Sequence, residues 1–143
     1  MNEAIRQVLA HKGGDIETID PHTSVFDAVE QMNMRRIGAL LVCDGDRPIG
    51  IFTERDVLMR VVAKRLDPET TPVGEVMTRG LVTVSADTSV VEAMMVITAK
   101  RCRHLPVFDG AELCGLVSIG DLTSWIVRDQ ERTISDLYDY ICR

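Results

Sequence analysis

Apolar and polar positions follow one order of elements through the first half of the chain. Residues 18–19 form a short extended segment, and the apolar positions of residues 25–32 recur at helical spacing after a turn-rich stretch. Two apolar runs, residues 39–43 and 48–52, flank an Asp-Gly-Asp sequence that is typical of a hairpin turn. A second helical pattern occupies residues 53–62. This half therefore predicts the order strand, helix, strand, strand, helix.

The same order returns in the second half without a gap. Residues 50–56, Gly-Ile-Phe-Thr-Glu-Arg-Asp, correspond to residues 115–121, Gly-Leu-Val-Ser-Ile-Gly-Asp, at an offset of 65 residues. The fold class is therefore α/β of the α+β kind, with two pseudo-symmetric lobes that each hold a small three-stranded sheet and two helices. The second copy predicts an extended segment at 82–84, a helix over 89–98, strands at 105–108 and 113–117, and a helix after 118.

Polar residues between the two copies set the expected boundaries. Residues 66–72 contain two prolines and indicate a linker, and residues 73–78 predict a short helix that leads into the second copy. Similar apolar spacing over residues 5–9 leads into the first copy. We expect the first copy with its lead-in helix over 1–65, linker and second lead-in over 66–80, the second copy over 81–128, and an amphipathic C-terminal helix over 129–143.

The predicted C-terminal helix has a pronounced apolar face. Ile134, Leu137, Tyr138 and Ile141 recur at the spacing of one helical face, with charged residues around them. Most such faces pack on their own domain, which is the first expectation here. A contact between subunits is the alternative.

Composition and charge argue against several classes of function. The 143 residues carry a net charge of −6 and no face rich in Lys and Arg, so nucleic acid is not an expected partner. The apolar stretches are too short to span a membrane, and the N-terminus lacks the pattern of a signal peptide. We therefore expect a cytoplasmic protein that is not associated with a membrane.

The four cysteines lack the spacing of a metal site. Cys43, Cys102 and Cys114 align with apolar residues of the other copy, which indicates that cysteine replaces an apolar side chain at these positions. Buried, reduced thiols are expected rather than disulfides, and no metal is expected.

A hydroxyl and a carboxylate recur at the start of the last helix of each copy. Thr53-x-x-Asp56 and Ser118-x-x-Asp121 both fit a capping box, in which the side chains only close the end of a helix. The same residues also suit a nucleotide, because a helix N-terminus with a hydroxyl favours phosphate and a carboxylate can accept hydrogen bonds from a ribose diol. The presence of the pattern in both copies makes the nucleotide interpretation stronger than either copy alone would.

These turns, together with Val76-Met77-Thr78 and the Arg103-His104-Leu105-Pro106-Val107 segment, resemble the paired CBS domains, also called a Bateman module. The resemblance covers essentially the whole chain and implies two lobes packed as one CBS pair. It implies that Thr53 with Asp56 and Ser118 with Asp121 contact the phosphate and ribose of adenine nucleotides. It further implies that the adenine is bordered by Ile16, Glu17 and Thr18 in one pocket and by Leu81, Val82 and Thr83 in the other.

The candidate cations differ between the two copies. Arg55 in the first turn corresponds to Gly120, whereas Arg103 and His104 correspond to Gly38 and Ala39. The remaining candidates are Arg36 and Arg101, which both copies share, and Lys12, for which a solvated lysine is the alternative. His104 also fits a hydrogen-bonded residue of an edge strand, and Pro106 restricts that strand. We expect two pockets that are not equivalent.

The resulting hypothesis is a regulatory sensor of adenine nucleotides. AMP or NAD is the favoured ligand, with ADP and ATP as further candidates; a homodimer and a separate effector protein are the expected partners. The chain has no phosphate-binding loop of the Walker type and no cluster typical of a catalytic centre, so no enzyme activity is expected. A structural dimerisation module without ligand is the alternative, and an unrecognised nucleotide-handling enzyme is a weaker one.

Overall fold

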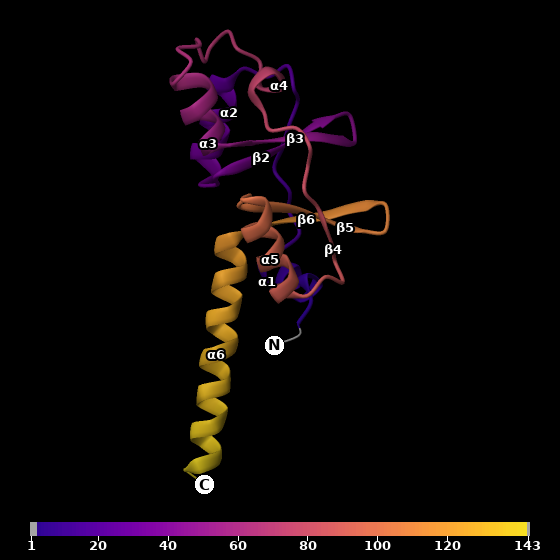
Figure 1. The fold of residues 1–143 in the computed structure, drawn as a ribbon, viewed down its shortest axis with the longest axis vertical. Coiled ribbons are helices and arrows are strands. Elements are labelled where there is room, and N and C mark those ends of the chain that lie inside the picture. Colours follow the sequence, from indigo (N-terminus) through magenta and orange to yellow (C-terminus); the bar gives the residue numbers. More distant parts are fainter. Residues whose placement is uncertain (1–2, 143) are drawn as a thin grey trace. The chain divides into compact units, whose positions relative to one another are not determined.

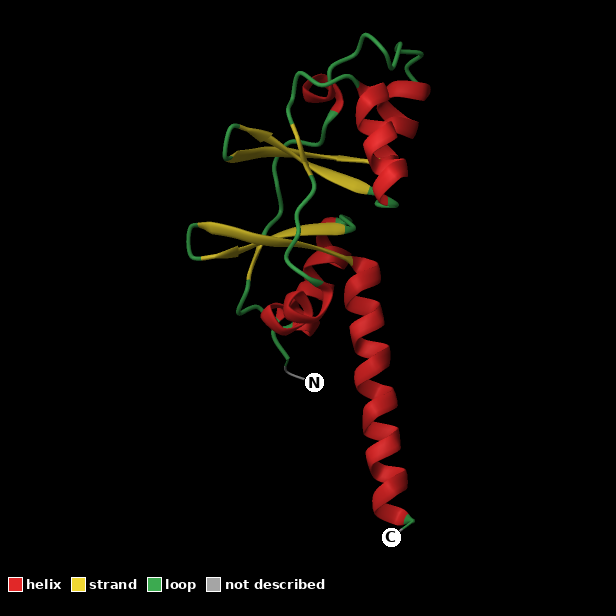
Figure 2. Cartoon of the chain, turned by 180° about the vertical axis from the view of Figure 1, so that it is seen from behind, coloured by secondary structure: helices red, strands yellow, loops and turns green. Residues whose placement is uncertain are grey.

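The structure, a computed structural model that describes residues 3–142, divides into two compact units (Figure 1). The first-repeat unit comprises residues 16–81, and the second-repeat unit comprises residues 1–15 together with 82–143. Each unit contains one three-stranded sheet with the same connectivity. Figure 2 shows helices against the sheet of each unit. The mixed α/β fold with two similar lobes is thereby confirmed.

The first-repeat unit is built on a sheet in the order β1-β2-β3, with β1 parallel and β3 antiparallel to β2. Its core contains the apolar side chains of β2 and β3 and of the helices that cover them. The elements are β1 (Thr18–Ile19), α2 (Val25–Arg35), β2 (Ala39–Asp44), β3 (Arg47–Thr53), α3 (Glu54–Asp56), η1 (Val57–Val62) and α4 (Val73–Val76).

The second-repeat unit has a sheet in the order β4-β5-β6 with the same parallel and antiparallel pairings. Its buried side chains form a core cluster of their own. The elements are α1 (Ile5–Lys12), β4 (Val84–Ser85), α5 (Val90–Lys100), β5 (His104–Asp109), β6 (Glu112–Ser118) and α6 (Ile119–Ile141).

Local sequence accounts for most element ends. Ser24 and Ser89 cap α2 and α5, because each side chain accepts a hydrogen bond from the backbone N–H three residues later. Gly45 sits in the hairpin turn at φ 62°, a conformation that an L-residue with a side chain adopts less readily. The elements agree with those that periodicity predicted, except that the extended segment expected at 82–84 is β4 at Val84–Ser85.

The lead-in helices pack crosswise, which the order of residues along the chain did not predict. Residues 1–15 were assigned to the first copy, but Ile5 and Val8 of α1 lie in the core of the second-repeat unit. Conversely Val73 and Val76 of α4, expected to lead into the second copy, lie in the core of the first-repeat unit. Apolar spacing shows that each helix has a face to bury, but it does not identify the sheet that receives it.

Two helices differ in form from the sequence prediction. The helix expected over 53–62 becomes a π-helix at η1, where Ala63 N–H donates to the Leu58 carbonyl five residues back. As a result Val61 is buried while Leu58 and Val62 are exposed. The boundary expected between 128 and 129 falls inside the single continuous helix α6.

The cysteines are less buried than expected. Cys43, Cys102 and Cys114 are half-buried free thiols, and burial raises the pKa of all three. Cys142 lies exposed after the end of α6. The expectation of buried thiols therefore holds only in part for the first three cysteines and is wrong for Cys142, because Cys142 follows the exposed second half of α6.

Candidate functional site

The first turn closes around a buried carboxylate. Thr53 caps α3: its Oγ1 accepts from Asp56 N–H at 3.3 Å, and its own N–H donates to Asp56 Oδ2 at 3.0 Å. Thr78 Oγ1 donates to the other oxygen, Oδ1, at 2.9 Å, and Arg60 Nε lies 3.6 Å from it. Asp56 is only 5% exposed. Both of its oxygens therefore have partners inside the first-repeat unit.

The second turn has the same capping geometry with a different third partner. Ser118 N–H donates to Asp121 Oδ2 at 2.8 Å, and Asp121 N–H donates to Ser118 Oγ at 3.1 Å. Lys12 Nζ lies 2.6 Å from the same carboxylate oxygen and also donates to the Leu116 carbonyl at 2.6 Å. The Asp121 side chain keeps 26% of its surface exposed. This carboxylate is thus paired with a cation but accessible from solvent.

The electrostatics of Asp121 reflect opposing effects. Partial burial raises the pKa of its carboxyl, whereas the hydrogen bonds from Lys12 and Ser118 and the charge of Lys12 lower it. The net result is a lowered pKa. Asp121 is therefore ionised at neutral pH and available as a hydrogen-bond acceptor.

The turns differ because the lead-in segments differ. Thr78 follows α4 and reaches Asp56, while Lys12 ends α1 and reaches Asp121. Thr78 and Arg60 were not among the predicted site residues. The Val76-Met77-Thr78 motif was a signal in the sequence that could have indicated Thr78. Lys12 was weighed as a phosphate ligand or a solvated side chain of the first copy; the structure pairs it with Asp121 of the second.

The residues expected to border adenine divide between the units. Thr18 pairs with Leu41 in the sheet of the first-repeat unit, and the Glu17 carbonyl accepts from Leu41 N–H at 3.1 Å. Ile16 is half-buried in the same unit. On the other side Val82 and Thr83 belong to the second-repeat unit with Ser118 and Asp121, whereas Leu81 ends the first-repeat unit.

The expected cations occupy distinct places. Arg36 and Arg101 are left-handed C-cap residues at φ 55° and 54°, so their backbones end α2 and α5 and their side chains are exposed. Exposed Arg55 donates to Met59 Sδ at 3.1 Å. Arg103 offers its carbonyl to Ile119 N–H, and His104 pairs with Ser118 in the sheet register. The register also pairs Pro106, which is buried, with Leu116.

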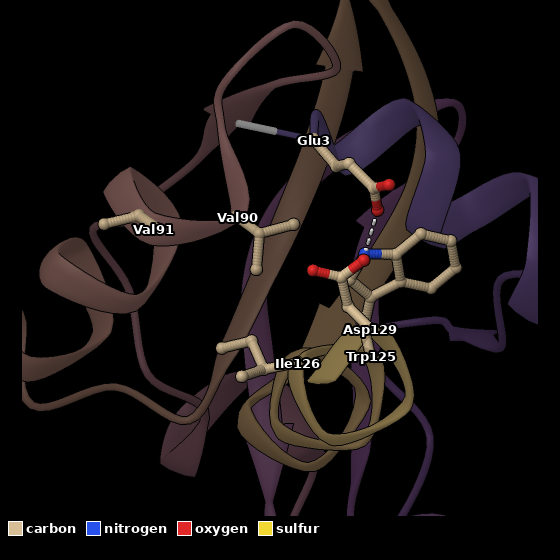
Figure 3. Close-up of a pocket in the computed structure, with 6 residues that line it drawn as sticks. All are labelled: Glu3, Val90, Val91, Trp125, Ile126 and Asp129. Atoms are coloured by element: carbon tan, nitrogen blue, oxygen red, sulfur yellow. Dashed lines mark hydrogen bonds between the residues drawn. The ribbon is translucent and has the colours of Figure 1, made fainter. Parts of the chain in front are cut away.

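A shallow pocket in the second-repeat unit lies apart from the turns. Figure 3 shows Val90 and Val91 of α5 across from Trp125 of α6, with Ile126 and Asp129 from the same helix completing the lining. Glu3 Oε2 accepts from Trp125 Nε1 at 2.6 Å. This hydrogen bond joins the N-terminal segment to α6 beside the pocket. Among residues 3–142 no group of His, Cys, Asp and Glu is arranged to hold a metal ion.

Comparison with known proteins identifies the family. The CBS domain matches residues 5–63 and again 73–128. The chain belongs to the CBS-domain family. Its two CBS repeats are 37% identical over 123 residues to the mitochondrial CBS domain-containing protein CBSX3 of Arabidopsis thaliana, covering 82% of this chain and 60% of that protein. The chain thus spans less than two thirds of this relative.

Solved CBS-pair structures share the fold. One is a candidate signal-transduction protein with CBS domains from Burkholderia ambifaria MC40-6. It is 41% identical with a TM-score of 0.86, and the match covers 90% of this chain and 96% of that chain. The hexameric CBS-CP12 protein from bloom-forming cyanobacteria is 29% identical with a TM-score of 0.76, over 86% and 67%. Within the part of the CBS pair that the structure describes, no helix has the length and apolar character of a membrane span.

Proposed function

We propose that this CBS pair is a regulatory module that binds an adenine nucleotide and modulates a separate protein. The observation that carries the proposal is one hydroxyl–carboxylate arrangement built twice, with Thr53 and Asp56 in one turn and Ser118 and Asp121 in the other. Each pair lies at the N-terminus of a helix, where phosphate is favoured, and each carboxylate can accept hydrogen bonds from a ribose diol.

The second turn is the stronger candidate site. At the first turn a ribose diol competes with Thr53 and Thr78 for a carboxylate that is almost fully buried. Asp121 is more exposed, and the ammonium of Lys12 beside it can neutralise a phosphate. We therefore propose that the second turn binds nucleotide more tightly, and that the first turn binds weakly or prefers another ligand.

The remaining parts of the proposal concern ligand, assembly and location. AMP or NAD is the first choice of ligand, and ADP and ATP are the next candidates, because all four share the adenosine and the phosphate that the turns address. A homodimer is proposed; the related CBS-CP12 protein is hexameric, so CBS pairs can assemble. The effector is a separate protein. A cytoplasmic location remains a prediction, and the relative CBSX3 is mitochondrial.

Nucleotide titration tests the proposal directly. AMP, ADP, ATP, NAD⁺ and NADH are titrated by calorimetry and by thermal unfolding; a ligand at a hundred times its Kd stabilises the folded state by about 2.7 kcal/mol. Asp121→Asn is expected to remove the tighter binding event, and Asp56→Asn the weaker one. Asp139→Asn, an exposed carboxylate on α6, is the matched control and should leave both unchanged. The absence of any shift with all five nucleotides contradicts the proposal.

A structural dimerisation module is the second candidate, and one observation favours it. Both capping boxes are complete within the protein alone, so Thr53, Asp56, Ser118 and Asp121 already have a structural role. This candidate predicts that each of Asp56→Asn and Asp121→Asn lowers the free energy of unfolding, and that adding nucleotide does not change the size of either effect. A nucleotide-handling enzyme requires measurable turnover of ATP or NAD, and product analysis at high protein concentration tests it.

A further inference from the structure

The second half of α6 carries apolar side chains that no part of its own unit covers. Every residue from 130 to 142 is exposed, and Ile134, Leu137 and Ile141 keep 66%, 56% and 77% of their surface accessible. Figure 1 shows this part of the helix running on beyond α1 and α5 of the same unit. The expectation that this face packs on its own domain is therefore wrong. Contiguous exposed apolar stripes usually mark a contact with another molecule.

The exposed stripe differs from the face that α6 packs on its own unit. Leu122, Trp125 and Ile126 pack on the core, and the same face continues as polar Thr133 and Asp136. The apolar positions move instead to a stripe roughly 100° around the helix axis, the step between consecutive residues. The sequence thus ends the intramolecular face of α6 and starts a second one.

This second stripe has the spacing of a coiled-coil seam. Its members alternate steps of three and four residues, and they are Val127, Gln130, Ile134, Leu137 and Ile141. In heptad terms the a positions are the β-branched Val127, Ile134 and Ile141, and Leu137 is at d. β-Branched residues at a with leucine at d favour two parallel strands.

We propose that this seam pairs with the same seam of a second copy of the chain, as a short parallel two-stranded coiled coil. Gln130 selects the orientation. In a parallel pair its amide faces Gln130 of the partner subunit and can exchange hydrogen bonds with it. In an antiparallel pair a d position faces an a position, so Gln130 faces an apolar β-branched residue such as Ile141 of the partner subunit, which leaves the amide without a polar partner. Arg132 and Asp139 lie on the opposite side of the helix, away from the seam.

A second copy fits this seam better than an unrelated helix for a physical reason. Each copy presents an apolar stripe of identical length and register, so pairing buries every seam residue on both helices at once. Two heptads are marginal as an isolated helix pair in water. The coil therefore rests on the homodimer proposed above, whose other contacts would raise the effective concentration of one helix for the other. The inference does not depend on nucleotide binding.

Site-directed cross-linking tests the seam. Cys142→Ser removes the exposed native thiol, and Leu137→Cys is introduced in that background of the full chain; Asp139→Cys is the matched control. At a d position of a parallel coil, paired Cα atoms come within reach of a disulfide, whereas residues on the outer face do not. Under glutathione disulfide, Leu137→Cys is expected to form covalent dimer at least about tenfold faster than Asp139→Cys.

The outcomes separate the alternatives. Equal rates for the two variants indicate random collision and overturn the proposal, as does the absence of dimer with Leu137→Cys. An antiparallel pair gives no Leu137→Cys dimer but joins an Ile134→Cys chain to a Leu137→Cys chain in a mixture, because a positions then face d positions; this result also overturns the parallel arrangement. Ile134→Cys, at an a position, provides a second variant with the same expected result. Nucleotide titration of each variant reports separately on the proposed ligand sites.

Discussion

Asp56 and Asp121 occupy the same position in the repeat, yet their surroundings give them different chemistry. Asp56 is buried and accepts from Thr53 and Thr78, so its first role is to hold α3 to the segment after α4. Asp121 is partly exposed and is held by Lys12. Both oxygens of Asp56 accept from protein donors, so a ligand must compete with them, whereas the hydrogen bonds from Ser118 and Lys12 to Asp121 converge on Oδ2.

Removing the Thr78 hydroxyl should destabilise the first-repeat unit. Thr78→Val keeps the shape of the side chain but leaves Oδ1 of buried Asp56 with Arg60 alone at 3.6 Å. An acceptor left unsatisfied in a buried site costs about 1–3 kcal/mol. Urea denaturation measures the change in the free energy of unfolding. Thr78→Ser keeps the hydroxyl, and its free energy of unfolding should be closer to that of the parent protein. Equal stabilities for Thr78→Val and the parent would show that this hydrogen bond contributes nothing.

The contribution of Asp121 to stability should depend on pH. Its folded-state pKa is lowered, so it lies below the value of about 3.9 for an unfolded chain. The ionised carboxylate therefore stabilises the fold above the unfolded pKa, and this stabilisation is lost as pH falls through the folded pKa. The difference in unfolding free energy between the parent protein and Asp121→Asn should be largest near neutral pH and shrink below about pH 4. Lys12→Met should reduce this pH-dependent difference; a difference that is constant with pH contradicts the assignment.

At the scale of elements, each lead-in helix is fitted to a glycine in the last strand of its sheet. A Cβ atom on Gly50 of β3 would lie 2.6 Å from Met77 Sδ and 2.9 Å from the Thr78 carbonyl oxygen. A Cβ on Gly115 of β6 would lie 2.6 Å from the side chain of Leu9 in α1. These glycines permit the lead-in segments to approach the sheets and so bring Thr78 and Lys12 to the turns. Both repeats have this close contact at the glycine, but the side chain that it brings to the turn is Thr78 in one and Lys12 in the other.

Gly50→Ala should be destabilising because a backbone carbonyl blocks the added methyl group. Overpacking of this kind costs about 1–3 kcal/mol, and it should also separate Thr78 from Asp56. Gly120→Ala is the matched control, since the nearest atom to an added Cβ is Ser118 Oγ at 3.6 Å and Gly120 lies in the first turn of α6. There alanine should be neutral or stabilise by up to about 1 kcal/mol. Thermal unfolding compares the two, and equal effects would contradict the close approach at Gly50.

At the scale of the whole molecule, the chain exchanges its lead-in helices between repeats. α1 completes the core of the unit that contains the second repeat, and α4 completes the core of the unit that contains the first. The first-repeat unit is contiguous because α4 follows the first repeat directly, whereas the second-repeat unit takes part of its core from α1, which precedes the first repeat in sequence. A unit of this size has little core to spare.

Truncating Ile5 in α1 should therefore destabilise the second repeat rather than the adjacent first one. Ile5→Ala removes a fully buried side chain, which costs about 2–5 kcal/mol. Hydrogen exchange should speed up first in α5, β5 and β6. Val73→Ala in α4 is the matched control, because Val73 is equally buried in the other core and should affect β2 and β3 instead. Faster exchange in β2 and β3 of the Ile5→Ala variant would contradict the exchange of lead-ins.

The sequence by itself determined the local features of this CBS pair. Apolar periodicity indicated the strands and helices, and the repeated Thr/Ser-x-x-Asp located both turns. Such features are predictable because they depend on residues within a few positions of one another.

Only the tertiary structure decided which distant residues meet at those turns. Residue spacing shows that α1 and α4 each have an apolar face, but the choice of sheet depends on long-range packing. That choice brought Lys12 to Asp121 and Thr78 to Asp56, and so made two turns of the same sequence pattern chemically different. It also left the seam from Val127 to Ile141 uncovered, because the core of the second-repeat unit contacts α6 only along its first turns. Periodicity identifies an apolar face; only packing determines what covers it.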